Sequence, residues 1–553
     1  MGPSAPLRDH EVEGPRVRTR QNLLNIDIQL FIQLQTQDDY TIIRLRNFKL
    51  MKILNAEQIR EIDSYTIKHE PIRSIDLMER ASRKCADWIR RRTGTQETFH
   101  VFCGMGNNGG DGLAIARMLA GTNRRTKVYK VRYSESPSED FLANEKRLNG
   151  VRNLYAHDLH DGEDFPDIGA GDVVIDALFG NGLSRRVEGF VARLIAHINR
   201  SDAFVIAVDL PSGLFGDDNR ENDHDAMIRA DYTLTFQFPK LSFMFGSNQV
   251  YTGEWVVLDI GLHPDAIRSA AARYVFLEKE DIRSMYKPRN RFSHKGHFGH
   301  ALLIAGSRGK MGAAVLSARS CLRSGAGLLT VHVPACGYDI IQLGVPEAMS
   351  SSDTDPDIIS ELPRVEGYRA IGMGPGTGLH DDTQRVLKKL IQDAPCPLVL
   401  DADAINILAM NPTWLDFLPA QSVLTPHPGE FERLAGKTTT DYDRFLRGKE
   451  FAQRYNLILV LKGAHTVVIS PAATCFFNAT GNPGMATGGS GDVLTGMIMG
   501  WLAQGYSTLE SSVMAVYLHG LAGDLAAKGK GYEGMVAGDL ADMIPKATKK
   551  ILI

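Results

Sequence analysis

The feature that most limits how this chain can fold is a repeated unit: a short apolar run, a glycine-rich turn and a helical pattern. In the first half these apolar runs cover residues 99–103, 172–178, 204–210, 232–238 and 254–260, and helical patterns cover 113–120 and 187–199. Strands that alternate with helices predict βαβ units and a parallel sheet covered on both faces. Ligands of such sheets bind beyond the carboxyl ends of the strands, where the glycine turns would lie.

A second series of the same kind follows a junction at residues 262–290. Its apolar runs cover 301–305, 328–333, 398–400, 422–424 and 457–461, and helical patterns cover 312–323 and 493–502. With 553 residues the chain is too long for one core. We therefore expect an α/β protein of two domains, at 51–275 and 282–553.

Residues 1–50 read differently from the rest. Asn55 and Gln58 form a capping-box pattern that opens the first helix, so the part of the chain with regular secondary-structure patterns begins near Met51. We expect residues 1–50 to be a poorly ordered extension, or to lie upstream of a true start at Met51.

Composition excludes several classes of protein. The chain carries 62 basic and 65 acidic residues, so electrostatics gives no case for nucleic acid or membrane partners. Six cysteines lack metal-ligand spacing, which predicts free thiols in a reducing compartment, the cytoplasm. The most apolar segment, 493–503, is too short to span a bilayer.

Three strand ends of the first half carry polar side chains. Residues 104–112 (GMGNNGGDG) place Asn107 and Asn108 between a strand and a helix, where backbone amides can face an anion. Asp176 precedes a glycine loop at 180–186, and Asp209 precedes Ser212 in the third loop. Each feature alone is typical of an Asn-Gly turn or a helix cap. Together their oxygens could surround one cation and one phosphate-bearing ligand.

The strongest signal of the second half is the run 488–492 (GGSGD). Glycines at a helix start leave amide groups free to hold a transferring phosphate, and Asp492 can take a proton from a substrate hydroxyl. The plain alternative is an aspartate favoured by the positive end of a helix, worth about 0.3–1 kcal/mol. Three further strand-end stretches fit the same groove: 372–378, 425–430 and 462–466.

Five motifs, in this order, resemble the bifunctional NAD(P)H-hydrate repair enzymes: 107–111 (NNGGD), 208–213 (VDLPSG), 425–430 (TPHPGE), 462–466 (KGAHT) and 488–492 (GGSGD). The resemblance covers about residues 52–550. It implies a Rossmann-like three-layer sandwich that interconverts the R and S epimers of hydrated NADH and NADPH. It also implies a ribokinase-like C-terminal domain that converts the S hydrate to NAD(P)H with ADP or ATP, releasing AMP or ADP and phosphate.

The resemblance also implies the residues of each site. Asp492 and Asp209 would be the catalytic acids or bases. The epimerase substrate would contact Asn107, Asn108, Gly109, Gly110, Asp111, Gly180, Asn181, Gly182, Leu183, Ser184, Arg185, Arg186 and Asp209. The dehydratase substrate would contact Ala313, Gly376, His427 and Asp492, and the nucleotide Lys462, Gly463, Ala464, His465, Thr466 and Gly491. Potassium would bind Asn108, Asp176 and Ser212, and magnesium would bridge the donor phosphates without ligands that the sequence identifies.

Two alternatives stay open at this point. The glycine turn and its aspartate are shared with ribokinase-like small-molecule kinases, and the first half could be only a nucleotide- or partner-binding module. We also expect small-molecule substrates, no nucleic-acid or membrane partner, and a homo-oligomer.

Overall fold

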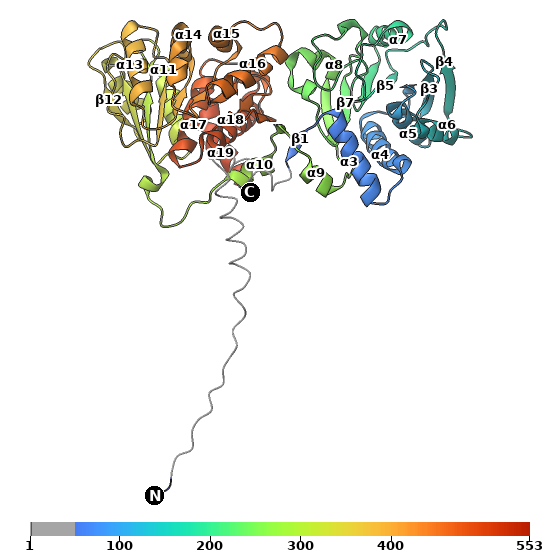
Figure 1. The fold of residues 1–553 in the computed structure, drawn as a ribbon, viewed down its shortest axis with the longest axis horizontal. Coiled ribbons are helices and arrows are strands. Elements are labelled where there is room, and N and C mark those ends of the chain that lie inside the picture. Colours follow the sequence, from blue (N-terminus) through green and yellow to red (C-terminus); the bar gives the residue numbers. More distant parts are fainter. Residues whose placement is uncertain (1, 3–49, 553) are drawn as a thin grey trace.

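The structure, a computed structural model, describes Gly2 and residues 50–552. The expectation of a poorly ordered extension therefore concerns residues that, apart from Gly2 and Leu50, lie outside the described ones. The expected α/β class is confirmed: two sheets form the centres of two domains that lie side by side along the long axis of the molecule (Figure 1). Within the described residues, no helix combines the length and apolarity that crossing a bilayer requires.

The N-terminal domain is built on a parallel sheet with the order β4-β3-β2-β5-β6-β7-β8 in the described residues. Its strands are β2 (Thr98–Cys103), β3 (Arg125–Val131), β4 (Leu154–Leu159), β5 (Val173–Ala177), β6 (Phe204–Val208), β7 (Tyr232–Phe236) and β8 (Glu254–Leu258). Its helices are α3 (Ala56–His69), α4 (Ser74–Arg92), α5 (Asn107–Ala120), α6 (Glu139–Arg147), α7 (Gly189–Asn199), α8 (Gln249–Thr252) and α9 (Pro264–Ser269).

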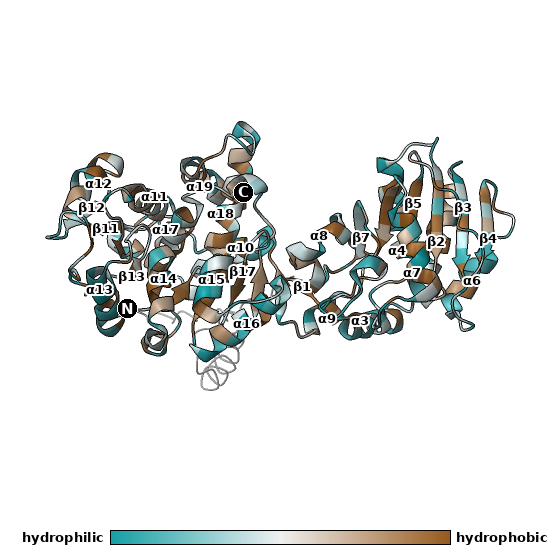
Figure 2. Cartoon of the chain, turned by 90° about the horizontal axis from the view of Figure 1, so that it is seen from above, coloured by the Kyte–Doolittle hydropathy of each residue, from teal (hydrophilic) through white to brown (hydrophobic). Residues whose placement is uncertain are grey.

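Two hydrophobic cores make this domain a three-layer sandwich, as expected. On one face, Val101 of β2 packs with Trp88 of α4 and Leu113 of α5. On the other face, Phe102 packs with Leu194 of α7. Alternate residues of one strand thus enter opposite cores, which explains why the central strands β2, β5 and β6 are mostly apolar on both faces; Figure 2 shows β2 and β5 largely in brown.

Residues 107–112 differ from the expected loop, because α5 already begins at Asn107. The glycines of this run are packing residues of the first helical turns. A Cβ at Gly109 would lie 1.8 Å from the carbonyl oxygen of Gly104, and one at Gly112 would lie 2.5 Å from Cβ of Ala177. Only glycine lets the helix start this close to β2 and β5. The asparagines therefore occupy the helix start itself.

The C-terminal domain contains a mixed sheet of the order β12-β11-β10-β13-β14-β15-β16-β17-β18-β9-β1 in the described residues. Its strands are β1 (Met51–Ile53), β9 (Tyr274–Phe276), β10 (His300–Ile304), β11 (Leu328–Val333), β12 (Met349–Ser352), β13 (Ala370–Met373), β14 (Leu398–Leu400), β15 (Val423–Leu424), β16 (Ile458–Leu461), β17 (Val467–Ile469) and β18 (Cys475–Phe477). The strands from β12 to β16 are parallel, and β17 runs antiparallel to both of its neighbours.

The helices of this domain cover both faces of the sheet. They are α10 (Lys279–Met285), α11 (Met311–Arg323), α12 (Tyr338–Gly344), α13 (Asp381–Asp393), α14 (Ala402–Met410), α15 (Pro428–Ala435), α16 (Asp441–Arg454), α17 (Ser490–Ala503), α18 (Thr508–Lys530) and α19 (Ala537–Leu552). One core joins α11, α17, α18 and α19 to the sheet, and the other joins α13, α14 and α16 to it.

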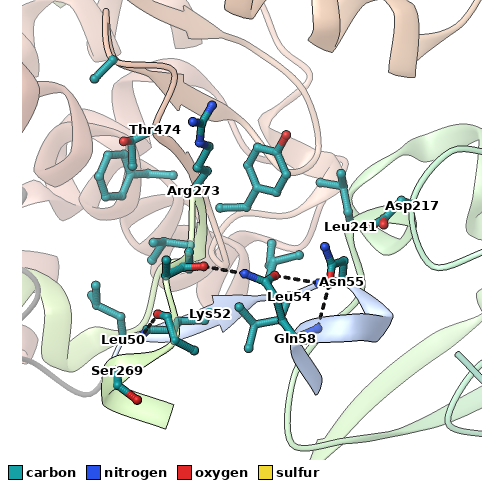
Figure 3. A pocket seen from close by; sticks show the side chains of 18 of the residues that line it. Leu50, Lys52, Leu54, Asn55, Gln58, Asp217, Leu241, Ser269, Arg273 and Thr474 are labelled. Carbon is teal, nitrogen blue, oxygen red and sulfur yellow. Dashed lines mark hydrogen bonds between the residues drawn. The ribbon is translucent and has the colours of Figure 1, made fainter. Parts of the chain in front are cut away.

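Two short strands cross from one domain to the other. β1 precedes the first helix of the N-terminal domain, yet Met51–Ile53 pairs antiparallel with β9 on the sheet of the C-terminal domain. β9 in turn pairs with β18. A cavity of about 890 Å³ lies at this crossing and is lined by residues of both domains, among them Leu54, Asp217, Arg273 and Thr474 (Figure 3). None of the predicted site residues lines it.

Candidate active sites

The order of the strands places one site in each domain. In the N-terminal sheet the chain runs outward from β2 to β3 and β4 and then returns to β5 on the other side of β2. Such a reversal opens a crevice at the carboxyl ends of the two central strands. A cavity of about 570 Å³ lies there. Its lining includes Asn107, Asn108, Asp111, Gly180, Asn181, Gly182, Leu183, Ser184, Arg185 and Asp209.

Asp209 forms an ion pair inside this cavity. It follows β6 directly and has a φ of 64°, a conformation that costs energy for a residue other than glycine and that is typical of functional positions. Its Oδ1 accepts a hydrogen bond from Nζ of Lys240 at 2.9 Å, and its Oδ2 accepts one from the backbone N–H of Asn181 at 3.2 Å. Lys240 is only 1% exposed. The ammonium group therefore holds this carboxylate at a fixed place beside the glycine loop.

Of the three residues predicted to hold potassium, Asp176 and Ser212 are in direct contact, and Asn108 lines the cavity beside Gly180. Oγ of Ser212 donates to Oδ1 of Asp176 at 2.6 Å, and the N–H of Ser212 donates to Oδ2 at 2.7 Å. Burial raises the pKa of Asp176 to about 6. A Cβ at Gly180 would lie 3.1 Å from Oδ1 of Asn108 and 3.3 Å from Oδ2 of Asp209. In the described structure, Nδ2 of Asn108 is buried without a hydrogen-bond partner.

Three of the predicted contact residues do not line the cavity. Gly109 and Gly110 face inward, and a Cβ at Gly110 would lie 2.9 Å from Sδ of Met78. The guanidinium group of Arg186 does not line the cavity; it contacts the backbone carbonyl and the carboxylate of Glu221. These positions support the loop geometry, whereas Arg185 reaches the cavity.

The site of the C-terminal domain lies at an equivalent reversal. The chain runs from β10 to β11 and β12 and returns to β13 on the other side of β10. Ala313 and Gly376 meet at this point, since a Cβ at Gly376 would lie 3.2 Å from Cβ of Ala313. Gly378 donates its N–H to Asp403 at 2.8 Å, which fixes the glycine loop against the start of α14.

Asp492 lies in the first turn of α17 among charged side chains from the neighbouring strand ends. Gly489, with a φ of 89°, precedes this helix and turns the chain into it. Burial and the charge of Asp401 raise the pKa of Asp492 to about 7, and the charge of Lys462 acts in the opposite direction. A carboxylate with this pKa accepts a proton near neutral pH much more readily than an ordinary aspartate.

Asp401 and Lys462 form the buried pair that shapes this environment. Nζ of Lys462 lies 3.0 Å from Oδ1 of Asp401 and 3.7 Å from Oε2 of Glu430. Burial alone would raise the pKa of Asp401, but Lys462 and the hydroxyl of Thr495, which donates at 2.6 Å, hold it below its ordinary value. A Cβ at Gly491 would lie 3.2 Å from Nζ of Lys462, so the lysine also faces the helix start.

The remaining predicted residues lie on the turns that follow β15 and β16. His427 caps α15: its Nδ1 accepts from the N–H of Gly429 at 3.1 Å, and its side chain remains half exposed. The turn 463–466 is closed by Thr466, whose Oγ1 donates to the carbonyl of Gly463 at 2.9 Å. His465 donates from Nδ1 to the carbonyl of Asn478 at 2.9 Å.

The sequence analysis missed Lys240, Asp63 and Asp401. Asp63 lies on α3 and lines the N-terminal cavity. The signals were weak but present: Lys240 ends a Phe-Pro-Lys stretch after an apolar run, and Asp401 begins an Asp-Ala-Asp stretch directly after one. Asp63 is an acid in an otherwise amphipathic helix, and no sequence pattern separates it from a surface residue.

Two α/β domains, each with charged side chains gathered at the carboxyl ends of its parallel strands, define a two-site α/β enzyme. Residues 301–546 match the family model described as NAD(P)H-hydrate dehydratase, and residues 74–242 match the one described as YjeF-related protein N-terminus. The chain is 35% identical to the bifunctional NAD(P)H-hydrate repair enzyme Nnr of Moorella thermoacetica, over 91% of this chain and 97% of that protein. This chain belongs to the family of bifunctional NAD(P)H-hydrate repair enzymes.

A second relative supports this family assignment: the Escherichia coli protein of the same name is 33% identical over 84% of this chain and 88% of its own length. Among solved structures, the ADP/ATP-dependent NAD(P)H-hydrate dehydratase from Bacillus subtilis, co-crystallised with ATP and Mg²⁺, is 33% identical, with a TM-score of 0.44. The match covers 50% of this chain and 98% of the Bacillus subtilis chain.

Proposed function

We propose that the two sites of this chain act in sequence on hydrated NADH and NADPH. The N-terminal site interconverts the R and S hydrates, and the C-terminal site converts the S hydrate to NAD(P)H with ADP or ATP. The observation that carries the second step is Asp492, a partly buried carboxyl with a pKa of about 7 at the glycine-rich start of α17. Lys462 and Asp401, whose charges act on this carboxyl, support the assignment.

The chemistry at Asp492 begins with the hydroxyl of the reduced nicotinamide ring. Asp492 takes the hydroxyl proton while the oxygen attacks the terminal phosphorus of the donor, and AMP or ADP leaves. Free amides at the start of α17 stabilise the charge on the transferring phosphoryl group. The ring nitrogen then supplies electrons as the carbon–oxygen bond breaks and phosphate leaves. Loss of a proton from the adjacent carbon restores the ring double bond.

Magnesium would neutralise the donor phosphates. In the described part of the chain, no three His, Cys, Asp or Glu side chains form a metal-binding group. This fits an ion held mainly by phosphate oxygens and water, as Mg²⁺ often is in such sites. Asp401 is engaged by Lys462 and Thr495, and Oε2 of Glu430 accepts the N–H of His427 at 2.8 Å, so neither carboxylate stands out as a dedicated ligand of the ion.

Potassium would bind in the N-terminal domain at Asn108, Asp176 and Ser212. Carboxylate, hydroxyl and amide oxygens are suited to a hard monovalent cation. The oxygens of Asp176 and Ser212 lie 2.6 Å apart, and Oγ of Ser212 lies 3.3 Å from the carbonyl of Phe179. The ion would neutralise the buried carboxylate and fix the loop that begins at Gly180.

A coupled assay tests this function. With S hydrate and ADP or ATP, we expect the absorbance of reduced nicotinamide to return as AMP or ADP and phosphate are released. Asp492→Asn should lower this rate by about 10²–10⁴-fold, because it removes the general base. Interconversion of R and S hydrates by the same variant should stay at the wild-type rate. A stable phosphorylated product would instead identify the chain as a kinase.

A further inference from the structure

Helix α3 contributes one face to the N-terminal cavity, although it lies before residues 74–242 that match the family model. Ala56, Ile59, Arg60 and Asp63 form the stripe of this helix that lines the cavity. The capping box of Asn55 and Gln58 fixes the start of the helix. Ile62 is buried against the core on the other side, so Asp63 is held in place by the packing of its neighbour.

The environment of Asp63 differs from that of Asp209. In the described structure, no hydrogen bond or ion pair reaches the carboxylate of Asp63, whereas Asp209 accepts from Lys240 and from the amide of Asn181. Burial raises the pKa of Asp63 to about 6, and the charge of Asp209 adds to the shift. Two carboxyl groups in one cavity with different surroundings are a common basis for separate acid–base roles.

We propose that Asp63 is the catalytic base, and then the acid, of the epimerase reaction, and that Asp209 is held by Lys240 as a fixed anion that orients the ring. The proposal rests on the epimerase function of this cavity. Asp209 already uses both oxygens for a cation and an amide. Asp63 has both oxygens available to exchange a proton with the substrate.

The step balances without a further reactant. Asp63 takes the proton of the ring hydroxyl, the carbonyl of an aldehyde forms, and the bond from that carbon to the ring nitrogen breaks. The electron pair of this bond goes to the nitrogen, which receives the proton from Asp63. After rotation of the aldehyde, the same transfers in reverse close the ring on the other face. The epimer forms, and Asp63 returns to its carboxylate form.

Interconversion of pure S hydrate in the absence of nucleotide isolates this reaction, because the dehydratase is then silent. Chromatography follows the R epimer, after subtraction of the uncatalysed rate. In the full chain, Asp63→Asn should lower the rate by about 10²–10⁴-fold, and Asp63→Glu should recover part of it. Glu61→Gln, an exposed change on the same helix, should leave the rate unchanged. Dehydration of S hydrate with ADP should also stay unchanged in all three variants.

The dependence on pH separates a proton-transfer role from a structural one. A base must be ionised, so the wild-type rate should fall as pH decreases through about 6. This decline should be retained by Asp63→Glu and lost from the residual rate of Asp63→Asn. The other titratable or charged groups lining the cavity are Arg60, Asp111, Tyr133, Arg185, Asp209 and Lys240, and Asp176 lies beneath it.

Each outcome decides the proposal. A wild-type rate in Asp63→Asn, together with a loss in Asp209→Asn, would overturn the role of Asp63 and leave the epimerase site intact. Wild-type rates in both variants would show that this cavity is not the epimerase site. If the decline near pH 6 persisted in Asp63→Asn, the titrating group would be Asp176 or another neighbour, and the proposal would also fail.

Discussion

At the scale of single residues, the pKa values of two neighbouring carboxyl groups in the C-terminal site are shifted in opposite directions. Asp401 is buried, Asp492 is partly buried and both are near Lys462, yet the pKa of Asp401 is lowered and that of Asp492 is raised to about 7. The difference comes from direct contact, because Lys462 and Thr495 donate to Asp401. Asp401 thus forms the ion pair with Lys462, and the pKa of Asp492 stays high enough for this carboxylate to accept a proton.

Replacement of Lys462 tests this arrangement. Lys462 lowers the pKa of Asp492, so Lys462→Met should raise it above about 7. Because the base acts when ionised, the fall of kcat at low pH should move to higher pH. The measurement is kcat for the S hydrate against pH at saturating nucleotide. Lys437→Met, at an exposed position, is the control and should keep the wild-type profile. An unshifted profile in Lys462→Met would contradict the assignment of Asp492 as the base.

The sequence predicted residues that belong to motifs and missed residues that stand alone. Asp492 and Asp209 were predicted because glycines, proline and serine mark their turns. Lys240 and Asp63 reach the same cavity as Asp209 from distant parts of the chain, and only the packing of α3 and the turn after β7 brings them there. The raised pKa of Asp492 could not be predicted from the sequence either, since it depends on Asp401, which lies 91 positions earlier in the chain.

At the scale of elements, α17 is positioned by its contact with α11. A Cβ at Gly496 would lie 2.1 Å from the carbonyl oxygen of Ser317, and one at Gly500 would lie 2.5 Å from that of Cys321. The two helices therefore approach through bare backbone. The same contact lets Oγ of Ser317 donate to the carbonyl of Asp492 at 2.8 Å, which fixes the catalytic turn.

A methyl group at this contact should force the helices apart. Gly496→Ala is expected to lower the free energy of unfolding by about 1–3 kcal/mol, as overpacking of a core usually does. It should also reduce dehydration, because the start of α17 moves with the helix. Urea unfolding followed by circular dichroism measures the first effect. Gly538→Ala in α19 meets open space and should be neutral or stabilising by up to about 1 kcal/mol. Equal stability of both variants would contradict the close approach.

The long central strands and the amphipathic helices were predictable from periodicity. The strands predicted at 99–103, 204–210 and 328–333 correspond to β2, β6 and β11 within one or two residues at each end. The starts of α5 and α17 were not, because glycine is unfavourable inside helices and the runs 107–112 and 488–492 read as loops. The short strands β1, β9, β17 and β18 depend on pairing between distant segments.

At the scale of the whole molecule, the two domains share one hydrophobic core. Leu241, Phe243 and Phe245 of the N-terminal domain belong to the same buried cluster as Phe445 and Phe477 of the C-terminal domain. The rings of Phe245 and Phe445 lie 5.6 Å apart. Arg220 and Asp443 add an ion pair of 2.8 Å across the boundary. The domains are therefore packed as one body rather than joined by a linker.

Lys52 of β1 ties this arrangement to α9. Its Nζ donates to the carbonyls of Ile267, Arg268 and Ala270 at 2.6, 2.9 and 2.6 Å, and the residue is 9% exposed. Lys52→Met should lower the free energy of unfolding by about 1.5–3 kcal/mol, since hydrogen bonds to a charged group are lost and buried carbonyls remain. Denaturant titration measures this. The exposed Lys68→Met should stay within about 0.5 kcal/mol of wild type; a similar loss there would contradict the role of Lys52.

The crossing of β1 and β9 limits how the two activities can be divided. A cut before residue 282, where the predicted second domain begins, would leave both strands on the N-terminal fragment. The C-terminal fragment would then present β18, with Cys475, Phe476 and Phe477, as an open apolar edge. Unpaired edges of this kind attract other chains and promote aggregation. A fragment that is to work alone must keep residues 274–276, and a separated pair would reassemble only by returning Met51–Ile53 to the other fragment's sheet.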